Sequence, residues 1–216
     1  VNLYSRDFYQ LAASRLEKKG LVAQWLLLST QNIDDSRSLV RSFLDVFPYA
    51  TLWTSEFHEM LLVGSMEPIE LDAEKISQRF QQESVRSTLQ DVGIGSAAAL
   101  LATWVTDRAG LERFAADALP VTDDEPRIEY APWVRAKEIS RVLPALLDLR
   151  QPASLLNADV GFTERMNAHQ QRLMQFYRAS LHAYDGDRDA WARDIREVMR
   201  GDGGNPYYRW FVGGDE

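Results

Sequence analysis

The chain has 216 residues, of which 45% are hydrophobic and 26% charged, a composition typical of a globular protein with a substantial core. Its 24 Lys and Arg residues against 32 Asp and Glu residues give a net charge of −8, which argues against nucleic acid as a partner. Cysteine is absent, which excludes disulfides and thiolate metal sites. No apolar run approaches the roughly 20 residues that span a bilayer. We therefore expect a cytoplasmic protein or the soluble part of a membrane protein.

The start of the chain predicts a helix followed by a buried strand. Apolar residues recur at helical spacing through residues 3–18, and Gly20 is suited to the position just after a helix. Residues 21–28 are short and almost uniformly apolar, which predicts a parallel strand covered on both faces. Val1 is not a methionine, and the helical pattern starts at once. We therefore expect this sequence to be a piece of a longer protein.

The next segment predicts a second helix and a β-hairpin. Asp34 or Asp35 is expected to cap the helix, which Pro48 ends. Two short apolar segments, residues 50–54 and 60–64, are joined by the polar turn SEFHE. This arrangement predicts an antiparallel pair of strands.

The middle of the chain predicts further helices. Asp72 and Ser96 are expected to cap two of them, the second of which carries apolar residues through Val105, and a short strand is possible at 127–130. The motif Gly93-x-Gly95-x-x-Ala98 formally matches a dinucleotide-binding fingerprint, but that site requires a preceding strand. The residues before it resemble the end of a helix. We interpret the motif as one helix ending and another beginning.

The last part of the sequence predicts helices only. Apolar stripes run through residues 139–146, 166–181 and 191–198, and a turn at Gly186 joins the last two. The composition changes near Pro132. We therefore expect two domains, residues 1–132 and a helical extension at 133–216.

Gln24 stands in the middle of the predicted buried strand. Strand alternation places it on the face opposite Ala23 and Trp25. A buried amide without a partner costs about 1–3 kcal/mol, so Gln24 must have one. That partner is either a neighbouring loop or a ligand, because open α/β sheets bind ligands beyond the carboxyl ends of their strands.

The other polar candidates have structural explanations as well as functional ones. The three histidines lack the i, i+4 spacing that would place two imidazoles on one metal ion. Asp123 and Asp124 are adjacent carboxylates beside Arg127, which is typical of a turn with an ion pair. A binding role for the two aspartates is the alternative.

The run LYSRDFYQLAASRLEKKGLVAQWL, residues 3–26, resembles the second half of the catalytic domain of the spermidine synthase-like family. The resemblance continues through Phe47-Pro48, the hairpin TLWTSEFHEMLLVGS and the segment TDDEPRIEYAP, and covers roughly the first 130 residues. Some bacterial members carry a membrane region ahead of this domain. The resemblance implies an α/β fold that is the C-terminal part of a Rossmann-like methyltransferase sheet: helix, parallel strand, helix and antiparallel hairpin, with appended helices.

The resemblance also implies a substrate-binding pocket. By this likeness Gln24 lines the pocket, Trp25 and the pair Leu3-Tyr4 lie near it, and Asp123 and Asp124 belong to the family's late acidic segment. True aminopropyltransferases have an aromatic-rich element before that segment, where this chain has ALPV.

A family member transfers an aminopropyl or methyl group to a small-molecule amine. The donor is S-adenosylmethionine or its decarboxylated form. The family's glycine-rich donor loop, acidic ribose ligand and Asp base would all precede Val1. We therefore expect this chain alone to bind no cofactor, to hold no catalytic residue and to be inactive.

A different hypothesis is a non-catalytic helical module for protein interaction or dimerisation. The helices from Val134 to Arg200 and the aromatic residues near the C-terminus would then form a docking surface. A truncated sheet would also expose an edge, so we expect a homo-oligomer.

Overall fold

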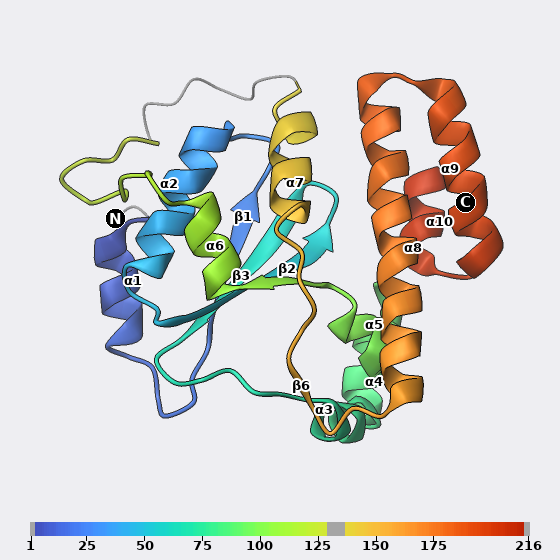
Figure 1. The fold of residues 1–216 in the computed structure, drawn as a ribbon, viewed down its shortest axis with the longest axis horizontal. Helices are drawn as coiled ribbons and strands as arrows, with labels where there is room; N and C mark the ends of the chain where they lie inside the picture. Colours follow the sequence, from blue (N-terminus) through green and yellow to red (C-terminus); the bar gives the residue numbers. More distant parts are fainter. Residues whose placement is uncertain (1–2, 129–136, 214–216) are drawn as a thin grey trace. The chain divides into compact units, whose positions relative to one another are not determined.

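A computed structural model describes residues 3–128 and 137–213 of the chain (Figure 1). It is a mixed α/β structure that divides into two compact units. The first unit comprises Val1–Ile69 and Trp104–Ala153, and the second comprises Glu70–Thr103 and Ser154–Glu216. The boundary predicted at Pro132 lies outside the described residues and stays a prediction.

The first unit is built on a four-stranded sheet in the order β1-β3-β2-β5 (Figure 1). Each neighbouring pair is antiparallel. The predicted hairpin is confirmed and is longer than expected. The strands are β1 (Val22–Leu27), β2 (Tyr49–Glu56), β3 (Glu59–Ser65) and β5 (Trp104–Asp107).

The predicted strand at residues 21–28 exists, but the prediction that it pairs in parallel is wrong for the neighbours that the structure describes. β1 pairs antiparallel with β3, and Gln24 lies opposite Leu62. Because β1 and β2 are both antiparallel to β3, these two strands run in the same direction on either side of it. The predicted order of helix, strand, helix and hairpin is confirmed.

Four helices of the first unit lie beside this sheet (Figure 1). The second of them contacts each of the other three. The predicted apolar stripe within residues 139–146 is fully buried. The helices are α1 (Arg6–Ala13), α2 (Ile33–Leu44), α6 (Arg108–Phe114) and α7 (Ile139–Leu147).

An aromatic cluster joins α1 and α2 to the sheet. The ring of Tyr9 lies 5.1 Å from that of Phe43, which lies 4.6 Å from Phe47, and all three side chains are completely buried. A Cβ atom on Gly64 would lie 2.6 Å from the Phe43 ring and 2.7 Å from Phe47. Glycine is therefore required where α2 crosses β3.

The ends of the first two helices differ from the prediction. Helix α1 ends at Ala13 and is capped by Ser5, and the left-handed residue before β1 is Lys19 (φ 61°) rather than Gly20. Asn32 caps α2 by accepting a 2.8 Å hydrogen bond from the backbone N–H of Asp35. The two predicted caps, at 34 and 35, instead lie in the first helical turn, where carboxylates favour the helix dipole.

The second unit is mainly helical. Its two short strands, β4 (Leu71–Asp72) and β6 (Leu155–Leu156), form a parallel pair that the sequence pattern did not predict. Its helices are α3 (Ala73–Phe80), α4 (Glu83–Asp91), α5 (Ala97–Leu101), α8 (Val160–Asp185), α9 (Arg188–Asp202) and α10 (Pro206–Val212).

The caps predicted at Asp72 and Ser96 are confirmed. Gly93 is left-handed (φ 84°) just beyond α4, so the glycine motif joins two helices as predicted. The predicted continuation of the Ser96 helix to Val105 is wrong. Helix α5 ends at Leu101, because the β-branched segment that follows is recruited into the first unit as β5.

Helices α8 and α9 form the predicted antiparallel hairpin around Gly186 (φ 81°). The C-terminal aromatic cluster packs on Phe176 of α8, whose ring centre lies 4.8 Å from that of Tyr208 and 5.0 Å from that of Phe211. Trp210 is 67% exposed. None of the helices in the described ranges combines the length and hydrophobicity that a bilayer span requires.

Candidate functional site

Gln24 lies on the covered face of β1. Leu26 and Leu28, which share its face, are 1% and 0% exposed, whereas Trp25 is 60% exposed on the other side. The predicted alternation is therefore confirmed, but the prediction that both faces are buried is wrong. Gln24 itself is half-buried, and its side-chain amide donates a 3.3 Å hydrogen bond to the carbonyl of Trp25.

The Gln24 side chain also shares a hydrogen bond with the hydroxyl of Tyr4. Tyr4 is half-buried just before α1. Burial and then the negative charge of Glu59 raise the pKa of Tyr4, and the hydrogen bond with Gln24 lowers this pKa. The net shift is upward, so the hydroxyl stays neutral at physiological pH. A glutamine that looked unpartnered in sequence thus belongs to a polar pair between β1 and the chain entering α1.

The loop that carries the acidic pair docks on the first turn of α1. The backbone N–H of Arg6 donates to the carbonyl of Val121 at 2.8 Å, and that of Asp123 donates to Oδ2 of Asp7 at 2.9 Å. The hydroxyl of Ser42 in α2 accepts a 2.7 Å bond from the N–H of Val121. These bonds fix residues 121–123 against both helices.

The acidic loop is a tight turn. The N–H of Glu125 donates to the carbonyl of Thr122 at 3.2 Å, and the carboxylate of Glu125 accepts from Arg127 at 2.8 Å. The predicted turn with an ion pair is thus present, but the acidic partner of Arg127 is Glu125 rather than Asp123 or Asp124. The carboxylates of Asp123 and Asp124 remain exposed.

The structure brings some of the predicted site residues together and separates others. Tyr4 and Gln24 are in contact, and Asp123 lies on the helix turn that follows Tyr4. Leu3 is 60% exposed, and Trp25 lies on the strand face opposite Gln24. A substrate-binding role for these residues and for Asp124 stays a prediction.

Three residues of the first unit were missed in the sequence. Glu59 acts electrostatically on Tyr4 and pairs with Leu27 across the sheet, a register that no local pattern reveals. The hydroxyl of Tyr9 and the Oε1 atom of Gln31 are buried without a hydrogen-bond partner within the described part of the chain. Such orphaned atoms are rare, and they occur where water or a ligand completes the hydrogen bonding.

Polar and acidic side chains lie on the elements around the contact between Tyr4 and Gln24. A neutral hydroxyl and an amide offer hydrogen bonds, while Glu59, Asp7 and the exposed pair Asp123-Asp124 supply negative charge on the surrounding elements. Among residues 3–128 and 137–213, no group of three or more His, Cys, Asp or Glu side chains is placed to hold a metal ion.

Comparison with protein-family models, with curated proteins and with solved structures finds no match to this chain.

Proposed function

We propose that the chain forms the acceptor-side wall of a spermidine synthase-like transferase, which moves an aminopropyl or methyl group from an adenosylmethionine-type donor to an amine. The observation that carries this proposal is the contact between Tyr4 and Gln24. The family resemblance assigns Gln24 to the pocket and Tyr4 to its entrance, although the two residues lie 20 positions apart in the sequence. In this proposal the chain supplies neither donor binding nor the proton acceptor.

The arrangement of strands supports this proposal. β1 and β2 run in the same direction with α2 between them in sequence, and an antiparallel strand is inserted between the two. Doubly wound sheets commonly contain such a strand near one edge. The order is compatible with the last strands of a Rossmann-like sheet.

The uncovered parts of β1 support it as well. Within the described residues, β1 is bonded to β3 alone, so its other edge is available to a further strand. On the sheet face opposite α2, Trp25, Leu61 and Trp53 lie side by side on adjacent strands. Trp25 is exposed and the other two are half-buried. A donor-binding half would cover both the edge and this apolar row.

The chemistry of the site agrees with an amine acceptor. A protonated amine is attracted by the surrounding carboxylates, and the Tyr4 hydroxyl and Gln24 amide can orient it by hydrogen bonds. Holding the acceptor in a fixed orientation is a large part of catalysis in group transfer. In this proposal the residues of the chain position the acceptor, and none of them takes a proton in the reaction.

The experiment is calorimetric titration of the chain with diaminobutane, with butylamine and with butanediol, an uncharged analogue. We expect the diamine to bind more tightly than the monoamine and the diol to bind most weakly, because the site is acidic. Replacing Gln24→Leu removes a hydrogen bond and should weaken diamine binding by up to about tenfold. Gln10→Leu is the matched control, since Gln10 is exposed on α1.

Three results would contradict the proposal. Equal binding of diamine and diol would show that the acidic groups do not select an amine, and an unchanged affinity in Gln24→Leu would show that the amide is only part of the core. A titration with S-adenosylmethionine tests the missing donor half. Micromolar binding of that donor to this chain would overturn the assignment.

A further inference from the structure

The second unit contains a largely apolar pocket that is independent of the site described above. Its volume is about 560 Å³, within the range of pockets that bind small molecules. The last turn of α3, the first two turns of α4 and the C-terminal end of α5 form its walls. The apolar lining residues are Ile76, Phe80, Val85, Leu89 and Leu100.

Most of these apolar side chains are incompletely covered. Phe80 is buried, whereas Val85, Leu89 and Leu100 are only half-buried although they come from two neighbouring helices. Apolar surface that is gathered in a concave site gains free energy when a ligand displaces water from it. The pocket therefore favours a ligand with an apolar body.

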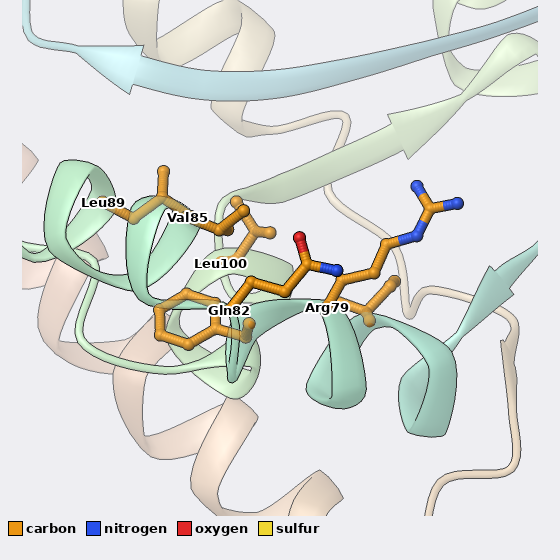
Figure 2. Close-up of a pocket in the computed structure, with 7 residues that line it drawn as sticks. Arg79, Gln82, Val85, Leu89 and Leu100 are labelled. Atoms are coloured by element: carbon orange, nitrogen blue, oxygen red, sulfur yellow. The ribbon is translucent and has the colours of Figure 1, made fainter.

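Two polar groups mark one part of the pocket. Figure 2 shows Val85, Leu89 and Leu100 together, with the Gln82 amide between them and the Arg79 guanidinium. Within the described part of the chain, the Arg79 side chain makes no ion pair or hydrogen bond, and that of Gln82 makes no helix-capping bond. The pocket thus combines an apolar lining with the Arg79 guanidinium and the Gln82 amide at its margin.

We propose that this pocket binds a monocarboxylate with an aliphatic chain. The carboxylate pairs with the guanidinium of Arg79 and accepts a hydrogen bond from the Gln82 amide. The chain lies along Val85, Leu89 and Leu100. A planar guanidinium suits a carboxylate because it can donate two parallel hydrogen bonds.

The experiment is calorimetric titration of the whole chain with hexanoate, octanoate and decanoate below their micelle concentrations, and with decanol. Affinity should rise by about fourfold for each added methylene, because each one buries further apolar surface. Decanol should bind about fivefold more weakly than decanoate, since it cannot form the exposed ion pair.

Two substitutions test the assignment. Arg79→Gln should lower decanoate affinity to that of decanol. Arg86→Gln is the control: it removes an exposed cation of α4 that pairs with Glu83 outside the pocket, and it should leave decanoate affinity unchanged. Leu89→Trp should fill the pocket and weaken decanoate and decanol alike. The amide and methyl NMR spectrum of each variant checks that the fold is retained.

Three outcomes would overturn the proposal. They are no binding of any probe, equal binding of decanoate and decanol, and equal effects of Arg79→Gln and Arg86→Gln. Sedimentation velocity in the same series tests a different occupant. A dimer that Leu89→Trp converts to a monomer, together with no decanoate binding, would mean that a second copy of the chain covers the pocket.

Discussion

Replacing Tyr9→Phe is expected to stabilise the protein. The Tyr9 hydroxyl is fully buried and has no hydrogen-bond partner within the described residues, and burial raises its pKa far above the usual value. The substitution removes the oxygen and keeps the ring, whose edge-on contacts with Phe43 and Phe47 have centre distances of 5.1 and 6.0 Å.

The magnitude follows from the cost of burying the hydroxyl. An unsatisfied buried polar group costs about 1–3 kcal/mol, so we expect the free energy of unfolding to rise by about 1 kcal/mol or more. In a chain of this size, 1 kcal/mol corresponds to an increase in Tm of about 2–4 °C. The assay is urea unfolding followed by circular dichroism. The slope of the unfolding free energy against urea concentration should stay unchanged.

Tyr49→Phe is the matched control, because Tyr49 is 41% exposed at the start of β2. Its effect should stay within about 0.5 kcal/mol. A loss of stability in Tyr9→Phe would refute the reasoning. It would show that the Tyr9 hydroxyl is satisfied by a bound molecule or by a segment outside the described residues.

Three further substitutions test the packing, the capping and the electrostatics. Gly64→Ala should lower the free energy of unfolding in urea by about 1–3 kcal/mol, because the new Cβ would overlap two aromatic rings. Gly95→Ala, with open space around its Cβ, should be neutral or stabilising. Equal effects of the two substitutions would contradict the packing described for Gly64. Asn32→Ala should cost about 1 kcal/mol by the same measurement, and no loss would mean that another residue caps α2. Burial and then Arg172 lower the pKa of His169 below 6.5, so the unfolded chain binds more protons and stability should fall as pH drops through 6.5. His169→Gln should reduce that slope, and an unchanged slope would exclude this histidine as its origin.

Local signals in the sequence predicted much of the fold. The caps at Asp72 and Ser96, the turn at Gly186 and the β-hairpin each depend on a few adjacent residues and were predicted correctly. Hydrophobic spacing also predicted the buried stripe of α7. These features can be predicted without knowing which distant residues they contact.

Features that depend on distant residues were not predicted. The pairing of β1 is decided by β3, and an apolar run by itself is compatible with either strand direction. Trp104–Asp107 continues a helical pattern in sequence, but pairing with β2 makes it a strand. The parallel contact of β4 with β6 joins segments more than 80 residues apart, which no local pattern encodes.

The surroundings of Gln24 were predicted in part. Alternation along β1 placed Gln24 on the face opposite Trp25 but did not tell which face is covered, and the family resemblance associated Gln24 with Tyr4. Neither approach indicated Glu59 or the buried hydroxyl of Tyr9, because both reach the site through tertiary packing. The pocket of the second unit was missed for the same reason: its lining comes from three helices whose apolar residues look like ordinary core positions.

The central claim is that the Tyr4–Gln24 pair faces an amine acceptor, and its most direct test follows the side-chain amide of Gln24 by NMR. Addition of diaminobutane is expected to shift the Gln24 amide resonances, and the shift should shrink in Tyr4→Phe while the amide of Gln10 stays unchanged. If the Gln24 amide does not respond at saturating diamine, or responds equally to butanediol, the pair is a structural contact and the acceptor-wall proposal is wrong.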